Sequence, residues 1–132
     1  MEELRRTVLN SNEIEDVQDL QLIQRIFMYV KNYCRYSKRA AAEAVKYCDD
    51  VRCIDMVEQK PIDPISFEQI DGTVDVHLLQ AFKMKNYPTV PQIFVYDTKW
   101  KYVGGCKEFM AIADNSSVSQ MNIHRSLARM KL

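Results

Sequence analysis

One cysteine of this chain lies where a thiol can become a nucleophile. Cys34 follows an apolar stretch that predicts a strand and precedes an alanine-rich stretch that predicts a helix. The free N–H groups and partial positive charge of a helix N-terminus stabilise a thiolate, and Lys31, Arg35 and Lys38 add positive charge nearby. Such surroundings lower a cysteine pKa from ~8.5 to between ~3.5 and ~7.5, and the thiolate is the form that attacks a disulfide. The simpler alternative is that Cys34 is a small buried hydrophobic residue.

Two further segments contain residues that shape the backbone. Thr89-Val90-Pro91 places a proline at the start of a predicted strand, and Gly104-Gly105-Cys106 places two glycines just before a predicted helix. Position 37, three residues after Cys34, is a serine. Cys34 therefore has no second thiol in its own segment.

The cysteines predict neither a disulfide framework nor a metal site. They stand at positions 34, 48, 53 and 106, with no Cys-x-x-Cys and no paired ligand spacing. A chain of this size and composition does not need a structural disulfide framework. His77 and His124 form no tight motif with them, so we expect no resident metal.

The composition indicates one ordinary domain without a strong charge. Eighteen basic residues balance eighteen acidic ones in 132 residues, which gives no broad electrostatic reason to expect nucleic acid or a membrane as a partner. No apolar run is long enough to span a bilayer, and the N-terminal region carries acids that transit peptides avoid. We expect a cytoplasmic monomer rather than a dimer, with an N-terminal extension at 1–20, helical over 2–9, and a domain at 21–132.

The elements that must position Cys34 follow from the pattern of apolar residues. Residues 23–30 predict a buried strand, which can begin as late as residue 26. Residues 36–47 predict a helix and 51–57 a second strand. The proline-containing stretch 59–72 predicts a long, mostly irregular connection.

The second half of the chain predicts a helix, a hairpin and two more helices. Residues 74–85 form the helix, with Thr73 or Asp75 as its cap and Asn86 in the left-handed position after it. Residues 91–96 and 101–103 form the hairpin, and 106–113 and 118–130 the last helices. A parallel crossover followed by an antiparallel hairpin predicts an α/β protein with a four-stranded mixed sheet and helices on both faces. This is the thioredoxin-like arrangement.

Three segments in this order resemble the glutaredoxin family. Residues 31–37, Lys-Asn-Tyr-Cys-Arg-Tyr-Ser, are similar to its active-site segment, whose usual form is Lys-Pro-Tyr-Cys-Pro-Tyr-Cys. Residues 89–95, Thr-Val-Pro-Gln-Ile-Phe-Val, and the Gly-Gly-Cys at 104–106 match two later family segments. The resemblance spans about residues 26–113.

The resemblance implies a binding groove for glutathione beside Cys34. Cys34 would carry glutathione as a mixed disulfide, Lys31 would face its glycine carboxylate, and Tyr36 would line the groove. The resemblance implies no metal site, except that Cys34 would be a ligand if the protein bound a metal cluster.

The two later segments would hold the rest of the glutathione molecule. Within Thr89-Val90-Pro91, Pro91 would be cis and the Val90 backbone would pair with the cysteinyl backbone of glutathione. Gly105 would permit close approach, and the N–H groups of Cys106 and Lys107 would hold the γ-glutamyl carboxylate. Lys107 stands where an acidic residue often helps to bind the γ-glutamyl amine, and Glu108 beside it is the alternative.

Ser37 decides which mechanism the resemblance implies. With a serine there, Cys34 can attack a glutathionylated protein, release the protein thiol and be regenerated by a second glutathione. The sequence therefore predicts deglutathionylation by a monothiol route, with glutathione as co-substrate and glutathionylated proteins as partners.

Two alternatives stay open. One is a [2Fe–2S] cluster held by Cys34 and glutathione from each of two protomers, although Arg35-Tyr36 differ from the family's Cys-Gly-Phe-Ser signature. The other is a degenerate domain used for protein contacts.

Overall fold

The computed structural model of the chain describes residues 1–115, and the helix predicted at 118–130 lies outside that range. The centre of the described part is a mixed sheet of five strands in the order β3-β2-β1-β4-β5. β1 (Arg25–Val30) pairs in parallel with β2 (Val51–Asp55) and antiparallel with β4 (Gln92–Tyr96). β5 (Trp100–Gly104) completes a hairpin with β4. The prediction of an α/β protein with a mixed sheet is confirmed.

The sheet has one strand more than the predicted four. β3 (Pro61–Ile62) pairs antiparallel with β2, with Ile62 opposite Cys53. The connection at 59–72, expected to be mostly irregular, therefore contains a two-residue edge strand that the sequence pattern does not predict. Prolines argue against a strand in the middle of a sheet, but β3 is at the edge, where a missing N–H interrupts no ladder.

β2 also ends two residues earlier than the predicted 51–57. The N–H of Gln59 donates to the carbonyl of Asp55 at 2.8 Å, and the N–H of Asp55 donates to the carbonyl of Lys60 at 2.9 Å. These bonds form the tight turn that leads into β3, so the chain leaves the strand at Asp55.

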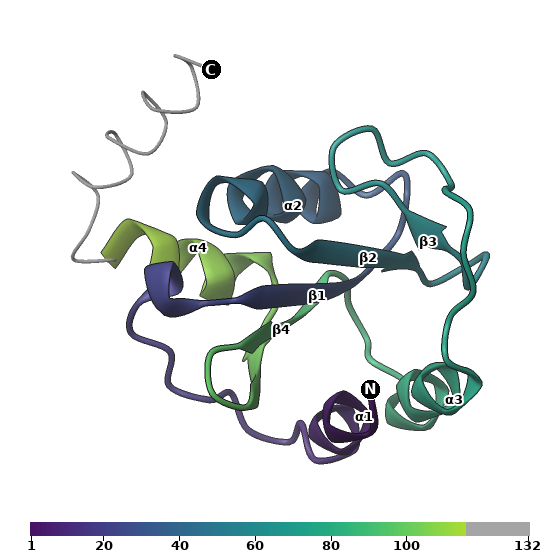
Figure 1. The fold of residues 1–132 in the computed structure, drawn as a ribbon, viewed down its shortest axis with the longest axis horizontal. Helices are drawn as coiled ribbons and strands as arrows, with labels where there is room; N and C mark the ends of the chain where they lie inside the picture. Colours follow the sequence, from purple (N-terminus) through teal and green to yellow (C-terminus); the bar gives the residue numbers. More distant parts are fainter. Residues whose placement is uncertain (116–132) are drawn as a thin grey trace.

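Within residues 1–115, four α-helices cover the two faces of the sheet (Figure 1). α2 (Arg35–Tyr47) and α4 (Cys106–Asn115) lie on one face, and α1 (Glu2–Leu9) and α3 (Val76–Lys85) lie on the other. A 3₁₀-helix, η1 (Leu20–Leu22), precedes β1. None of the helices in this part of the chain has the length and apolar character that crossing a membrane requires.

α3 shows how local signals set the ends of a helix. The side chain of Asp75 accepts hydrogen bonds from the N–H groups of His77 at 2.8 Å and Leu78 at 3.1 Å. Asn86 adopts the left-handed conformation, with φ of 45°. Asp75 is thus the cap and Thr73 is not, and the helix begins at Val76 rather than at residue 74.

The alternation of side chains along β1 feeds both layers of the core. Ile26, Met28 and Val30 point to the face of α2 and α4, whereas Phe27 and Tyr29 point to the face of α1 and α3. All of them are buried. β1 is therefore the central strand that fixes where the segment after it, including Cys34, leaves the sheet.

Candidate active site around Cys34

Cys34 lies at the point where β1 gives way to α2. It is the N-cap residue of α2, with extended backbone angles φ −87° and ψ 118°. Its N–H donates to the carbonyl of Lys31 at 3.1 Å, and its carbonyl accepts from the N–H of Lys38 at 3.1 Å. The side chain is partly exposed, whereas the other three cysteines are buried, and all four are free thiols. Cys34 is therefore the thiol best placed to meet a substrate.

The surroundings of Cys34 lower the pKa of its thiol. Partial burial acts in the opposite direction and raises it, but it is outweighed by hydrogen bonds from the Ser37 N–H and hydroxyl and from the Tyr36 N–H. The charge of Lys31 lowers the pKa further. These are the effects expected of a helix N-terminus and a neighbouring cation. The site is thus arranged to hold a thiolate.

Ser37 is more than a missing cysteine. Its side chain is completely buried, its hydroxyl stabilises the Cys34 thiolate, and its Oγ also accepts from the N–H of Lys31 at 3.4 Å. The sequence predicts only that Ser37 removes a second thiol. Its role as a hydrogen-bond partner depends on the helical turn that brings residues 34 and 37 together.

Asp55 is a residue of the site that sequence reasoning misses. Its carboxylate, at the end of β2, is buried and accepts from the N–H groups of Asn32 at 3.1 Å and Glu58 at 2.8 Å. It therefore ties the loop before Cys34 to the neighbouring strand. The signal was an acidic residue at the end of a predicted strand, hidden because that strand was predicted to continue to residue 57.

The segment Thr89-Val90-Pro91 lies at the same edge of the sheet as Cys34. Tyr29 pairs with Gln92, so Pro91, one residue before Gln92, lies beside the end of β1. The Val90–Pro91 peptide bond is cis, as expected. Pro91 is buried, while Thr89 is exposed.

A buried glutamine holds this segment in place. Gln92 is 3% exposed, and its Nε2 donates to the carbonyl of Thr89 at 2.7 Å. Its Oε1 accepts a hydrogen bond from the hydroxyl of Tyr102. Sequence reasoning assigns Gln92 only to the strand, because nothing in the local pattern shows that its side chain turns back to the preceding loop.

The start of α4 approaches Pro91 closely. A Cβ atom on Gly105 would lie 3.4 Å from the Pro91 carbonyl oxygen, in van der Waals contact with it. The N–H of Gly105 donates to Glu108 Oε1 at 2.9 Å, and this carboxylate would lie 2.9 Å from a Cβ on Gly104. The glycine at position 104, where φ is 112°, therefore leaves room for Glu108 to fold over the turn.

Cys106 and Lys107 open α4 with different exposure. Cys106 is buried and Lys107 is exposed. Burial raises the pKa of the Cys106 thiol, Arg39 lowers it, and the negative charges of Cys34 and Glu108 raise it. The first turn of α4 is thus electrostatically coupled to Cys34. Figure 1 shows α2 and α4 starting at the same end of the sheet.

Among residues 1–115, no three His, Cys, Asp or Glu side chains are grouped so that they could hold a metal ion. Cys34 offers a single accessible thiol. The arrangement can therefore perform thiol chemistry with one cysteine, and a metal cluster there would need thiolates from other molecules.

Comparisons with known proteins point to one family. A glutaredoxin-1 from Rhizophagus irregularis is 26% identical over 113 residues, which cover 83% of this chain and 95% of that protein. No family model matches the chain, and no solved structure gives a significant match. The similarity supports the glutaredoxin family and suggests a glutathione-dependent thiol oxidoreductase, and the mixed sheet with helices on both faces is consistent with a thioredoxin-like fold.

Proposed function

We propose that this chain reduces glutathione mixed disulfides by a monothiol route in which Cys34 is the nucleophile. The observation that carries the proposal is the placement of Cys34 at the N-cap of α2, where Ser37, Tyr36 and Lys31 lower the pKa of its thiol. Ser37 occupies the position of a resolving cysteine and is itself buried. A second thiol is therefore absent where a dithiol mechanism would need it.

The proposed cycle has two exchange steps. The Cys34 thiolate attacks the glutathione sulfur of a mixed disulfide, forms a Cys34–glutathione disulfide and releases the substrate thiolate, which takes up a proton. The thiolate of a second glutathione then attacks that glutathione sulfur, releases Cys34 as a thiolate and leaves as glutathione disulfide. The net reaction exchanges one disulfide for another: the two glutathione molecules end joined as glutathione disulfide, and the substrate sulfur leaves as a thiol.

The glutathione molecule would be held by the three segments that meet at this edge of the sheet. Lys31 would face its glycine carboxylate and Tyr36 would line the groove. The backbone of Val90, in the loop that Gln92 fixes through Thr89, would pair with the cysteinyl backbone.

The first turn of α4 would bind the other end of glutathione. Gly105 permits the approach, and the N–H groups of Cys106 and Lys107 would hold the γ-glutamyl carboxylate. Glu108 offers the carboxylate for the γ-glutamyl amine, because it already lies over the Gly104-Gly105 turn.

The test is the glutathione-coupled reduction of a small glutathione mixed disulfide. We expect turnover by the native protein and none by Cys34→Ser. Cys48→Ser is the matched control, because Cys48 is a buried cysteine outside the proposed site whose Sγ is 3.5 Å from the carbonyl of Asp50, a contact that a serine can keep. Absence of turnover in folded native protein would overturn the proposal. Iron and sulfide bound to anaerobically purified protein, without turnover, would favour the cluster alternative.

A further inference from the structure

α2 begins with a cluster of cations where helices usually carry acids. Arg35, Lys38 and Arg39 lie in its first two turns, and its first turn contains no acidic residue. The partial positive charge of a helix N-terminus disfavours cations there. Spacings of three and four residues place the three side chains on one helix face, where like charges also repel one another. We call these three residues the basic rim.

The cations of the other helix ends do not share this arrangement. Arg6 lies in the last turn of α1, and Lys83 and Lys85 lie in the last turn of α3, where the helix dipole favours them. α4 carries Lys107 in its first turn, but Glu108 follows directly. Among the α-helices of residues 1–115, α2 is therefore the one whose first turn carries cations without an acid beside them.

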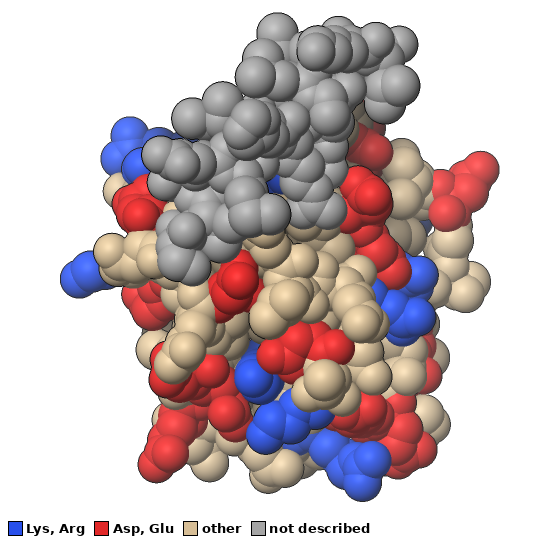
Figure 2. All heavy atoms as spheres, turned by 60° about the vertical axis from the view of Figure 1, so that its left-hand side comes forward, with Lys and Arg blue, Asp and Glu red and all other residues tan. Residues whose placement is uncertain are grey.

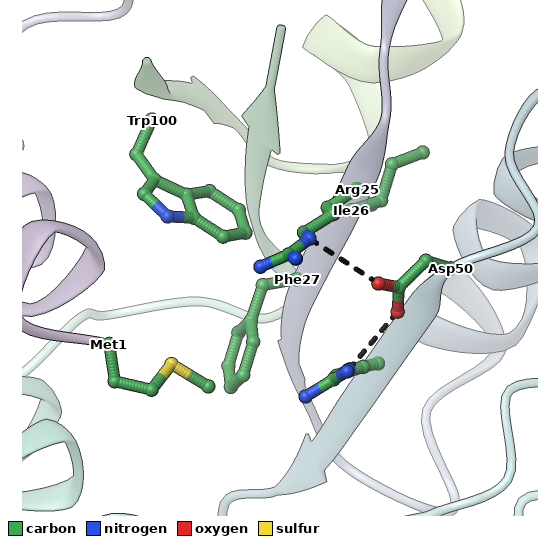
Figure 3. A pocket seen from close by; sticks show the side chains of 7 residues that line it. Met1, Arg25, Ile26, Phe27, Asp50 and Trp100 are labelled. Atoms are coloured by element: carbon green, nitrogen blue, oxygen red, sulfur yellow. Dashed lines mark hydrogen bonds and ion pairs between the residues drawn. The ribbon is translucent and has the colours of Figure 1, made fainter. Parts of the chain in front are cut away.

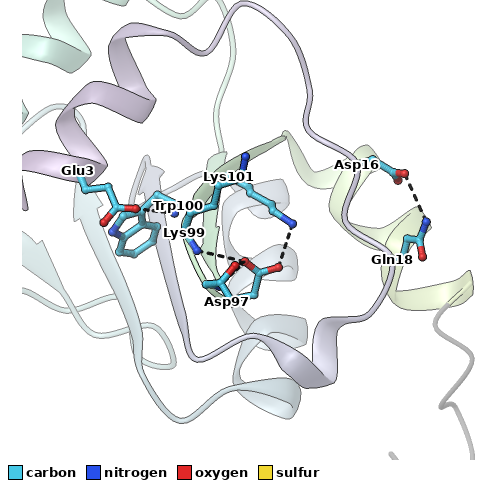
Figure 4. A network of polar contacts seen from close by, with 8 residues as sticks. Glu3, Asp16, Gln18, Asp97, Lys99, Trp100 and Lys101 are labelled. Atoms are coloured by element: carbon cyan, nitrogen blue, oxygen red, sulfur yellow. Dashed lines mark hydrogen bonds and ion pairs between the residues drawn. The ribbon is translucent and has the colours of Figure 1, made fainter.

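Several cations elsewhere in residues 1–115 form ion pairs with acids. Arg25 and Arg52 both contact Asp50, at 3.5 and 3.1 Å, in a niche at the far end of β1 from Cys34 (Figure 3). Lys101 contacts Asp97 at 2.9 Å in the β4–β5 hairpin (Figure 4). On the face shown in Figure 2, basic and acidic side chains are interspersed.

The basic rim has no such partner among residues 1–115. The guanidinium of Arg35 lies over the Tyr36 ring at 5.1 Å and donates to its hydroxyl at 3.2 Å. The ammonium of Lys38 lies 5.9 Å from the centre of the Phe67 ring. These contacts orient the cations without neutralising them. Tyr33 and Tyr36, which are 70% and 50% exposed, add aromatic surface beside the thiol.

We propose that the basic rim selects glutathionylated proteins that carry acidic side chains next to the modified cysteine. This inference rests on the proposed function, because it concerns which protein the site would accept. A protein anion fits better than a nucleic acid, since the rim is three residues on a chain of zero net charge and the proposed reaction acts on a protein cysteine. Charges at the edge of an interface act mainly on the rate of association and are screened by salt.

The experiment compares three glutathionylated peptides that differ only in the residues flanking the cysteine, which are Glu, Gln or Lys. We expect kcat/KM to be about tenfold higher for the acidic than for the basic peptide at low salt, and the ratio to shrink at higher ionic strength. The triple variant Arg35→Gln, Lys38→Gln, Arg39→Gln should bring the ratio close to one. Using the ratio cancels any change in the reactivity of Cys34 itself.

The matched control removes three exposed charges elsewhere, by Arg6→Gln, Lys83→Gln and Lys99→Gln, and should keep the preference. Equal rates for all three peptides would overturn this inference while the proposed function stands. If neither the peptides nor a small mixed disulfide are turned over by folded protein, the proposed function and this inference fall together. Binding of a short DNA duplex that the rim variant loses, without any peptide preference, would also overturn it and favour a nucleic acid partner.

Discussion

The two faces of the sheet are packed by different kinds of side chain. On the face of α2 and α4, much of the helix surface that meets the sheet is alanine. These alanines are all buried: Ala40, Ala41, Ala44 and Ala113. On the face of α1 and α3, Phe82 stacks on Tyr29 with 4.1 Å between ring centroids, and Phe27 and Phe94 lie around it.

This difference separates two tasks. Small side chains let a helix approach the sheet closely, so the alanines fix the height of α2 above β1 and hence the position of Cys34 at its start. Large aromatic rings bury much more apolar surface per residue than alanines do, so each ring on the opposite face contributes more to stability than an alanine. We therefore expect substitutions on the aromatic face to change stability, and substitutions on the alanine face to change the chemistry of Cys34.

The largest effect is expected for Phe82→Ala. Phe82 is 1% exposed, and losing its ring should lower the free energy of unfolding by about 3–5 kcal/mol. The measurement is urea unfolding, with Met84→Ala on the same helix as control, because Met84 is 75% exposed. The pH profile of Cys34 alkylation should not change while the variant stays folded. An altered profile would show that the two faces are not separate.

Ala44→Leu tests the other face. Ala44 is fully buried, so a larger side chain should overpack the layer, cost about 1–3 kcal/mol and displace α2. We expect the pKa of Cys34 to rise as the helix N-terminus moves, which slows alkylation at neutral pH. Ala42→Leu on the exposed side of α2 is the control. A variant that loses stability but keeps the native alkylation profile would contradict the proposed role of the alanines.

Ser37→Ala isolates one hydrogen bond within the site. The pKa of Cys34 is lowered partly by the Ser37 hydroxyl, so removing that hydroxyl should raise it. The thiolate would then form at higher pH, and iodoacetamide would react severalfold more slowly near pH 7. The check is the alkylation rate against pH, with Thr98→Ala in the hairpin as control. An unchanged midpoint would mean that the backbone N–H groups of Tyr36 and Ser37 suffice.

The smallest effect is expected for Asp97→Asn, in the turn of the β4–β5 hairpin (Figure 4). Burial raises the pKa of Asp97, but the N–H groups of Thr98 and Lys99 and the ammonium of Lys101 outweigh this effect. The pKa of Asp97 is therefore lowered to about 2. A carboxyl pKa below its unfolded value of ~3.9 stabilises the fold above that pH, and the stabilisation is lost as the pH falls toward 2.

The variant should therefore be less stable than the native protein by less than ~1 kcal/mol at pH 7, because the pair is partly exposed. The difference should disappear near pH 2. Urea unfolding at both pH values measures it. A difference that persists at low pH would show that the geometry of the turn, rather than the charge, sets the stability.

Much of this architecture was predictable from local patterns. The apolar run of β1, the alanine-rich α2, the cap Asp75 and the left-handed Asn86 each depend on residues within a few positions of one another. The order of these elements implied a mixed sheet with helices on both faces. The position of Cys34 between a strand and a helix was predictable for the same reason.

Other features depend on contacts between distant parts of the chain, and only the tertiary structure decided them. β3 exists because the edge of β2 is free to pair with it. Asp55 reaches back 23 residues to the Asn32 N–H, and Tyr102 reaches back 10 residues to Gln92. The sequence by itself indicated that Cys34 lies between a strand and a helix with cations nearby, because helix propensity and local charge act over short distances. What positions that thiol was decided by buried polar side chains, since each must find a hydrogen-bond partner wherever the fold provides one.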